Sequence, residues 1–382
     1  MYSPQLDPSA SNGGNRNSST SNLPHENGSA IFEAVYSLFL KFVGSTGFAK
    51  NVKEFLWKVL SISPAFLAKF YSLGFLGLLG LRPPSIIIAH DLPMLPLGAQ
   101  LARHYSCALI FDSHEYYPGQ VMSRLESRAW RKIEAKYVKD VSALITVNDS
   151  IAGIFQSLYQ LKKICVVQNA VDALRGAEYA HVELREKLDL PLSEKIVLFQ
   201  GALSPGRNLQ SLVHSLRFVK TKNIKLVFLG DGLESASLRE LAKSLGVGSL
   251  VLFHPKVPQD LLLNYTAGAD LGVIPYIDNC INNRFCTPNK LYEFIAAGLP
   301  VLGTNLPEVE KILRKYEIGR TVDMLLPESI AESIDAIFSD EEHFSSMRRN
   351  VKVASASINW QIEGLKWMEV ISSVHKPKQM TD

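Results

Sequence analysis

Residues 287–302 read Thr-Pro-Asn-Lys-Leu-Tyr-Glu-Phe-Ile-Ala-Ala-Gly-Leu-Pro-Val-Leu, and this stretch decides the fold because it joins a helix start, a helix stop and a strand. Thr287 is a typical N-cap, Pro288 suits the first helical position, and Gly298 with the Leu-Pro pair after it ends the helix. The pattern therefore predicts a short helix over residues 288–297.

The start of this helix suits an anion. Helix N-termini attract phosphate groups, and Lys290 falls in the first turn, where a cation opposes the helix dipole unless an anion is bound. Arg284 lies just upstream. Glu293 follows one turn later, where a carboxylate can accept hydrogen bonds from vicinal hydroxyls such as those of a ribose. These residues indicate a nucleotide-sugar site, and a solvated glutamate on an amphipathic helix is the alternative for Glu293.

Length and composition agree with this interpretation. A chain of 382 residues exceeds one ordinary core and indicates two domains. The net charge is +3 with both signs mixed along the chain, which argues against a nucleic-acid-binding protein with a basic stripe. The cysteines match no common zinc or redox spacing, and we expect all four to be reduced and structural: Cys107, Cys165, Cys280 and Cys286.

The amino-terminal region divides into two parts. Residues 1–30 predict a disordered tail without the features of a signal peptide. Residues 31–81 predict amphipathic helices, and their most hydrophobic run, residues 65–81, is marginal for a membrane span because it contains Lys69. Core packing is the simplest role for residues 31–81, and peripheral contact with an anionic membrane is the alternative. We expect a cytoplasmic protein, with association at the inner face of the membrane under that alternative.

After residue 84 the sequence alternates between strand and helix patterns, which predicts parallel sheets covered by helices on both faces. The first series of strands is expected at residues 85–89, 108–111, 143–147 and 164–167, with helices at 95–104 and 123–140. The second series is expected at residues 196–200, 226–229, 250–253, 271–274 and 301–303. The polar segment 171–194 is the expected linker. The fold class is therefore α/β, with two doubly wound, Rossmann-like domains facing a cleft.

Ligands of such sheets bind outside the carboxyl ends of the strands, which is where polar residues gather in this chain. The loop 201–208 follows the strand that ends at Gln200. Its glycines let backbone amides approach a phosphate, and Arg207 can bind a phosphate with two hydrogen bonds. A simple turn with a solvated arginine would look similar. The turn Gly230-Asp231-Gly232 follows the next strand and is a weak signal by itself.

Histidines and carboxylates end two strands of the first series. They could chelate a divalent metal for hydrolysis, and the possible ligands are His90, Asp91, Asp112, His114 and Glu115. The pairs lack the helical His-x-x-x-His spacing of many zinc hydrolases. A satisfied buried histidine is a further alternative for His90.

The segment 287–302 resembles the donor-site signature of retaining glycosyltransferases of family four and its relatives, which have the GT-B fold. In that family two glutamates bracket this helix; the second binds the donor ribose and the first contacts the donor sugar. Glu293 matches the second, whereas Phe285 stands in place of the first, in a Pro-Asn-Lys-Leu-Tyr-Glu version of the motif. The resemblance implies donor contacts from Pro288, Asn289, Lys290 and Leu291.

Other segments carry the same resemblance. The loop 201–208 is similar to the family's phosphate loop: Gly201 matches its glycine and Arg207 occupies its lysine position, while Ala202 and Asn208 replace the usual arginine and glycine. The resemblance implies that the backbone near Lys256 and Val257 contacts the nucleotide base.

In the first domain, the resemblance implies that His114 faces the donor sugar beside the cleft. Further sugar or acceptor contacts are then expected from His90, Asp91, Glu115 and Arg284. Asn148 follows the strand ending at Val147, where the family often has serine.

The resemblance covers residues 85–371 and implies an acceptor-side domain over 31–172 and a donor domain over 190–345. Residues 346–375, with a helix from Trp360 to Val374, would cross back to the first domain. Residues 1–81 do not resemble the strand and glycine-rich loop with which family members open.

The activity implied is transfer of a sugar from a nucleotide-diphosphate-sugar donor to a saccharide or lipid-linked acceptor, with retention of configuration, in surface polysaccharide or glycolipid synthesis. His114, Arg207 and Lys290 would be catalytic, without a cofactor or metal, because charge stabilisation replaces the metal. Two other classes stay open: a non-catalytic nucleotide-sugar-binding subunit, which the changes at 285 and 202 would suit, and a nucleotide-sugar epimerase.

Overall fold

The computed structural model describes residues 83–172 and 183–375. The expected tail, the expected amphipathic helices and membrane contact of residues 31–81, and part of the expected linker 171–194 lie outside these ranges. Among the helices within them, none is both long enough and apolar enough to cross a membrane.

The first sheet contains four parallel strands in sequence order. They are β1 (Ile86–His90), β2 (Ala108–Ser113), β3 (Ala143–Thr146) and β4 (Ile164–Val166). Its helices are α4 (Asp91–Tyr105), α5 (Arg124–Tyr137) and α6 (Asp149–Tyr159), with single 3-10 turns η2 (Tyr117–Gly119) and η3 (Val138–Asp140). All four expected strands are present.

Two helix boundaries differ from the prediction. α4 begins at Asp91 rather than at residue 95, since Pro93 lies in its first turn, where backbone N–H groups have no partner within the helix and a proline costs little. The expected helix 123–140 ends at Tyr137 and continues as η3.

The second sheet contains six parallel strands in the order β10-β9-β8-β5-β6-β7. They are β5 (Lys195–Gln200), β6 (Ile224–Leu229), β7 (Val251–His254), β8 (Leu271–Ile274), β9 (Val301–Thr304) and β10 (Gly319–Val322). The sequence did not predict β10, because this edge strand reads Gly-Arg-Thr-Val and lacks an apolar run. β7 begins one residue later than expected, because Gly248–Leu250 forms the 3-10 turn η4.

The remaining helices surround this sheet or follow it. They are α7 (Glu183–Lys187), α8 (Leu209–Ser215), α9 (Ser235–Ser244), α10 (Leu262–Ala267), α11 (Ile281–Arg284), α12 (Asn289–Ala296), α13 (Pro307–Tyr316), α14 (Pro327–Ser339), α15 (Glu341–Ser357) and α16 (Trp360–Val374). We call each sheet with its covering helices a domain.

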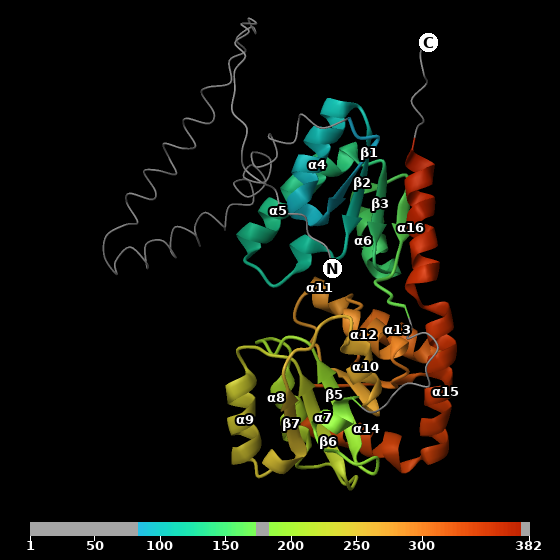
Figure 1. Ribbon diagram of the computed structural model, residues 1–382. Coiled ribbons are helices and arrows are strands. Elements are labelled where there is room, and N and C mark those ends of the chain that lie inside the picture. The colour runs from blue at the N-terminus through green and yellow to red at the C-terminus, as the bar shows by residue number, and fades with distance from the viewer. Residues whose placement is uncertain (1–82, 173–182, 376–382) are drawn as a thin grey trace, which may run out of the picture. The chain divides into compact units, whose positions relative to one another are not determined.

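The last helix packs on the first sheet although it follows the second in sequence. Trp367, Val370 and Ile371 of α16 contact a cluster of buried residues that includes Ile110 and Ile145 of β2 and β3, and Figure 1 shows α16 running beside these strands. Separate apolar clusters fill the two faces of the second sheet. The closing helix therefore covers one face of the first domain.

The strand order of the second sheet reverses between β5 and β8. β5 pairs with β6 on one side and with β8 on the other. In doubly wound sheets the helices on the two sides of such a reversal diverge and leave a crevice at the carboxyl ends of the strands. The reversal therefore places a crevice beside Gln200, at the end of β5, and after Ile274, at the end of β8.

Candidate functional site: a pocket at the strand reversal

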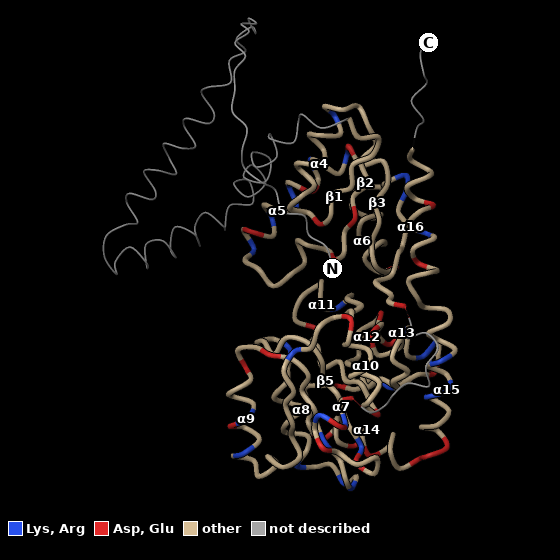
Figure 2. Tube along the Cα trace, in the orientation of Figure 1, with Lys and Arg blue, Asp and Glu red and all other residues tan. Residues whose placement is uncertain are grey.

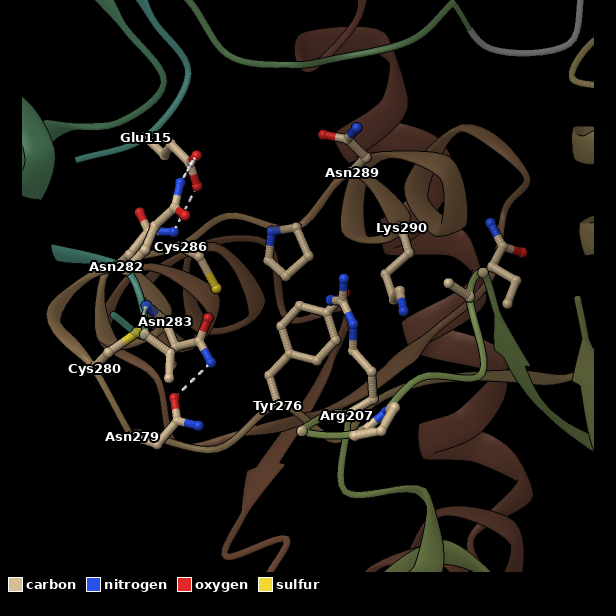
Figure 3. A pocket seen from close by; sticks show the side chains of 18 of the residues that line it. Glu115, Arg207, Tyr276, Asn279, Cys280, Asn282, Asn283, Cys286, Asn289 and Lys290 are labelled. Atoms are coloured by element: carbon tan, nitrogen blue, oxygen red, sulfur yellow. Dashed lines mark hydrogen bonds between the residues drawn. The ribbon is translucent and has the colours of Figure 1, made fainter. Parts of the chain in front are cut away.

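A cavity of about 700 Å³ lies at this crevice. Its walls come from β5 and the loop after it, from the segment between β8 and α12, from α12 itself, and from the region of η2 in the first domain (Figure 3). The lining residues used below are Glu115, Gln120, Gln200, Gly201, Arg207, Tyr276, Asn282, Lys290 and Glu293. The cavity is large enough for a nucleotide-sized ligand.

Lys290 lies at one end of the pocket and is only 7% exposed. Its Nζ is 3.9 Å from the ring centroid of Phe199 and 4.8 Å from that of Tyr276. Among the described residues no carboxylate lies within ion-pair distance of this ammonium. Burial, and then the nearby charge of Arg207, lower the pKa of Lys290 to about 7. A bound anion would favour the charged form of Lys290 and would reduce the repulsion from Arg207.

Arg207 lies beside Lys290 and faces the same space (Figure 3). Its guanidinium carbon is 4.4 Å from the ring centroid of Tyr276, so Tyr276 lies against both cations. The loop that carries Arg207 begins at Gly201, where φ is +116°. A Cβ at Gly201 would lie 3.7 Å from Lys290 Nζ, so the loop backbone passes close to the lysine.

The turn Gly230-Asp231-Gly232 supports this loop from behind. A Cβ added at Gly230 would lie 2.1 Å from the Gly201 carbonyl oxygen, and one at Gly232 would lie 2.2 Å from that of Leu203. Leu203 N also donates to the Asp231 carbonyl oxygen at 3.0 Å. Glycine is therefore required at both positions because the backbone of the loop 201–208 packs directly against them.

Glu293 is held by a glutamine that the sequence did not single out. Gln200 Nε2 donates to Glu293 Oε2 at 2.5 Å, and Gln200 Oε1 accepts from Thr266 Oγ1 at 2.8 Å. Gln200 is 2% exposed, and its amide orientation follows from its partners, because the carboxylate oxygen of Glu293 needs a donor. Glu293 Oε1 has no hydrogen-bond partner among the described residues, which leaves it available to a ligand.

The other end of the pocket is lined by amides and one carboxylate. Glu115 Oε2 accepts from Asn282 Nδ2 at 2.7 Å, and Glu115 Oε1 accepts from the Gln120 amide. Burial raises the pKa of Glu115, and the Asn282 hydrogen bond partly offsets this. Asn282 Oδ1 is buried and has no hydrogen-bond partner within the described ranges. This end therefore offers hydrogen-bonding groups that suit hydroxyls.

Phe285 does not line the pocket. Its ring packs against the apolar cluster of the first domain, and its carbonyl oxygen accepts from Asn148 Nδ2 at 2.8 Å. Asn148 Oδ1 in turn accepts from Ile151 N at 3.0 Å and caps α6. The position where the family has a glutamate is thus used here for contact between the two domains.

The prediction that Thr287 caps the helix is wrong. α12 begins at Asn289, and Pro288 occupies the N-cap position with extended backbone angles. Thr287 Oγ1 lies 3.4 Å from Asn148 Nδ2 instead, so its hydroxyl faces the first domain. Because Pro288 takes the N-cap position, Thr287 lies one residue too early in the chain to cap the helix.

The histidines and carboxylates of the first domain form a cluster beside β1 and β2. Asp112 Oδ2 lies 2.8 Å from His90 Nδ1 and 3.1 Å from His114 Nε2, and the hydrogen bond to Asp112 raises the pKa of His114. These three residues could hold a metal ion. Asp91 and Glu115 do not join them: Asp91 Oδ1 accepts from His114 N at 3.1 Å, and Glu115 faces the pocket. His90, Asp91 and His114 do not line the pocket.

The remaining predicted residues lie at different depths. Pro288 and Asn289 line the pocket, whereas Leu291 is fully buried in the core of the second domain. Lys256 is exposed and Val257 packs on that core, both away from the pocket walls. Arg284 is also outside the pocket, and its Nη1 lies 3.6 Å from Asp278 Oδ2. The base contact proposed for Lys256 and Val257 therefore stays a prediction.

Sequence reasoning missed Gln200, Tyr276, Gln120 and Asn282 as pocket residues. The first two follow from the reversal rule, since they lie at or just beyond the ends of β5 and β8. Asn282 and Gln120 had no such signal, because their place depends on a contact between two domains.

With this geometry known, comparison with other proteins is informative. Residues 182–354 match the profile of glycosyl transferases group 1, and residues 56–170 match the glycosyl transferase 4-like domain. The two matches cover both domains. The chain belongs to this glycosyltransferase family.

Curated members of the family with similar sequences come from several microorganisms. The chain is 25% identical over 274 residues to an uncharacterized glycosyltransferase of Methanocaldococcus jannaschii, covering 69% of each protein. It is 26% identical to a D-inositol 3-phosphate glycosyltransferase of Corynebacterium urealyticum, covering 65% of this chain and 61% of the relative. It is 33% identical to a candidate teichuronic acid biosynthesis glycosyltransferase of Bacillus subtilis, covering 64% and 62%.

Solved structures of other proteins share the fold. Anabaena HepE in complex with UDP aligns with a TM-score of 0.66 at 16% identity, covering 81% of this chain and 82% of that one. WaaG, described as a glycosyltransferase of lipopolysaccharide biosynthesis, aligns with a TM-score of 0.57 at 17% identity, covering 71% and 80%. The two parallel α/β sheets of this glycosyltransferase are therefore a GT-B fold.

Proposed function

We propose that this glycosyltransferase moves a sugar from a nucleotide-diphosphate-sugar donor to a hydroxyl of a saccharide or lipid-linked acceptor, with retention of configuration. The observation that carries the proposal is the pair Arg207 and Lys290, two cations without a carboxylate partner that face one pocket at the strand reversal. A diphosphate is the ligand that best matches two adjacent cations and a loop that begins with glycine.

The diphosphate would be neutralised by the protein itself. Lys290 is buried, and burial together with the charge of Arg207 lowers its pKa to about 7, so its charged form is disfavoured there. A diphosphate between Lys290 and Arg207 would favour the charged lysine and reduce the repulsion between the two cations. The same charges would stabilise the diphosphate as it leaves, which is the contribution that a metal makes in other transferases. We therefore expect turnover to persist in a chelator.

The nucleoside end would be held by Glu293. Its Oε2 is fixed by Gln200, and its Oε1 is available to a ribose hydroxyl. Gln200 is in turn fixed by Thr266, so the carboxylate is positioned before the donor arrives. Asn289 and Pro288 at the start of α12 complete this wall.

The sugar would occupy the end formed by Glu115 and Asn282. Glu115 retains lone pairs beyond the two that it uses, so it can accept a hydrogen bond from a sugar hydroxyl. This carboxylate comes from the first domain and would replace the sugar contact that Phe285 cannot make. His114, next to Glu115 in sequence, lies outside the pocket wall, so it would contact only a part of the sugar or acceptor that extends beyond Glu115, beside His90 and Asp91.

In the proposed reaction, the acceptor hydroxyl attacks the anomeric carbon on the face from which the diphosphate leaves. The bond between the anomeric carbon and the acceptor oxygen forms as the bond to the diphosphate oxygen breaks. The acceptor proton passes to that diphosphate oxygen, so no protein carboxylate has to form a glycosyl intermediate. The relative named for teichuronic acid biosynthesis supports an acceptor in surface polysaccharide assembly.

Nucleotide binding tests the donor site directly. We would measure the thermal stability of the full chain with UDP, GDP, ADP, CDP and TDP, starting with UDP because HepE was solved with it. A ligand at 100 times its dissociation constant stabilises the folded state by about 2.7 kcal/mol. We expect a shift with one nucleotide that is lost in Glu293→Ala and kept in Glu328→Ala, a matched change in the first turn of α14. No shift with any nucleotide would overturn the proposal.

A non-catalytic donor-binding subunit is the second candidate, and the use of Phe285 for domain contact favours it. Such a protein would bind the nucleotide but would neither transfer nor hydrolyse the sugar. An epimerase would instead change the donor without any acceptor. Mass spectrometry of the donor with and without a mixture of acceptors distinguishes the three outcomes.

A further inference from the structure

Helix α5 presents a continuous cationic face. Six basic residues on α5 and η3 are exposed: Arg124, Arg128, Arg131, Lys132, Lys136 and Lys139. At 100° per residue they project within an arc of about 140°. The acidic residues of this span are not on that face: Glu134 is buried, Asp140 pairs with Arg103 at 2.7 Å, and Glu126 projects to the other side. Figure 2 shows Lys and Arg recurring along α5.

Most of these cations have no partner in the described part of the chain. Arg124, Arg128, Lys132 and Lys139 make no ion pair there. Arg124 also occupies the first position of α5, where the helix dipole disfavours a cation. The local electrostatics therefore oppose this arrangement, and an external anionic surface would stabilise it.

Two large apolar side chains stand exposed beside the cations. Val121 is 74% exposed and Leu125 is 76% exposed. Nucleic acid offers a phosphate backbone but little for such side chains to enter, whereas a bilayer interface accepts both cations and apolar groups. Charge and exposure together therefore favour a membrane containing anionic lipids.

The packing of α5 fixes this face relative to the donor pocket. Ser127 Oγ donates to the Pro118 carbonyl oxygen at 2.7 Å, and the Trp130 and Tyr117 rings lie 4.9 Å apart, so α5 is joined to η2. η2 contacts α11, which lines the pocket, and Val121 lines the pocket itself. A surface bound by α5 would therefore lie next to the pocket entrance.

We propose that the cationic face of α5, with Val121 and Leu125, docks this protein on an anionic lipid bilayer. The surface is separate from residues 31–81, for which the sequence predicts a membrane contact, and it does not require the proposed donor site. Docking here would present the pocket to a substrate held in the membrane.

Vesicle co-sedimentation of the full chain tests this proposal. We would compare vesicles of phosphatidylcholine with vesicles containing phosphatidylglycerol, using wild type and the double variant Arg128→Glu/Lys132→Glu. The matched control is Arg349→Glu/Lys352→Glu on α15, where two exposed cations lie beside an exposed valine. From the contribution of each basic residue near an anionic surface, the loss of two cations alone weakens binding about 30-fold, and the two glutamates add repulsion, so we expect the α5 variant to bind anionic vesicles at least about 30-fold more weakly, with the control unchanged.

Two further measurements complete the test. Leu125→Asp should weaken vesicle binding without changing the circular dichroism spectrum, because the side chain is exposed. Nucleotide binding should be the same in all variants, which separates this proposal from the donor site. Equal vesicle binding by wild type and the α5 variant would overturn it, as would equal losses in the α15 control. Preference for RNA over anionic vesicles, unaffected by Leu125→Asp, would assign the face to nucleic acid and would also overturn it.

Discussion

Lys290 is the residue whose charge state most directly controls the pocket. Burial and Arg207 lower its pKa to about 7, so without a bound anion it would lose its proton as the pH rises through 7. A bound diphosphate stabilises the charged form and raises this pKa. We therefore expect affinity for a nucleotide-diphosphate sugar to be highest below pH 7 and to fall by up to about tenfold per pH unit above it.

Calorimetric titration between pH 6 and pH 9 measures this dependence. The nucleotide-diphosphate sugar is the right ligand, because its diphosphate is esterified at both ends and does not titrate in this range. Lys290→Met should bind more weakly at pH 6 and should lose the pH dependence. Equal dissociation constants for wild type at pH 6.5 and pH 8.5 would contradict the role of Lys290.

Arg207 is the second residue on which the proposed chemistry depends. Its loss removes one preorganised charge from the leaving diphosphate, and such losses typically cost about 100-fold in turnover or more. We expect Arg207→Ala to show this reduction in single-turnover assays of sugar transfer. Arg314→Ala, at an 80% exposed position on α13, is the control. Near-normal turnover in Arg207→Ala would remove Arg207 from the mechanism.

At the scale of an element, the segment from α11 to α12 joins the two domains as well as forming the pocket. Phe285 lies between these helices and packs on the first domain. Phe285→Glu, which restores the family's glutamate in sequence, should therefore not restore a sugar contact. It should lower the free energy of unfolding by about 1–3 kcal/mol, because a carboxylate replaces a ring in an apolar cluster. Denaturant unfolding measures this, with Phe285→Leu as the tolerated control; a more active Phe285→Glu variant would show our placement to be wrong.

Helices α5 and α6 share a buried carboxyl group whose proton affinity depends on folding. Tyr159 of α6 donates to Glu134 Oε2 of α5 at 2.5 Å, and burial raises the pKa of Glu134 to about 7. The folded state therefore binds more protons than the unfolded state between about pH 4.5 and pH 7, so this group makes stability fall as the pH rises through that window.

Glu134→Gln removes the titration but keeps an acceptor for Tyr159. We expect it to raise the free energy of unfolding by about 1–3 kcal/mol at pH 8 and to change it little at pH 4.5. Urea unfolding at both pH values measures the difference. A variant that is less stable than wild type at pH 8 would indicate that the ionised carboxylate is stabilised by groups other than those described.

At the scale of the whole molecule, the carboxyl-terminal helix links the two domains. Glu363 of α16 is 2% exposed, and its Oε2 accepts from Gln168 N at 2.9 Å. The apolar side of α16 covers the outer face of the first sheet. Glu308 is a second buried carboxylate at the contact between the two domains. Its Oε1 accepts from Ser150 N at 3.0 Å and so joins α13 to α6.

Removal of α16 should expose the covered face. Truncation after Ser357 removes four apolar side chains from the first domain, of which one is buried and three are partly buried. Full burial contributes about 1.5–3 kcal/mol per side chain, so with partial burial of three we expect a loss of at least about 4 kcal/mol. Thermal unfolding and binding of a hydrophobic dye measure the result. Truncation after His375 is the matched control and should behave as wild type. Equal stability of the two truncations would show that α16 does not hold the first domain.

Local sequence patterns predicted most of the helices and strands but not the contacts between them. Apolar runs with turn residues between them predicted nine strands, because a buried parallel strand has a composition of its own. They missed β10, whose four residues include a glycine and an arginine. The ends of α4 and α5 moved by a few residues because caps and prolines depend on which backbone groups find partners elsewhere.

The α/β class, the order of the elements and the residue types at the strand ends could be predicted from the amino-acid sequence, because they follow from short-range periodicity and turn chemistry. The sequence also placed Glu293, Arg207 and Lys290 near one strand edge. Three contacts became known from the folded structure: Gln200 fixes Glu293, Glu115 faces the pocket from the other domain, and Phe285 packs away from the pocket. Those facts depend on which strands lie next to each other and how the two domains meet, and contacts between residues far apart in sequence leave no local pattern.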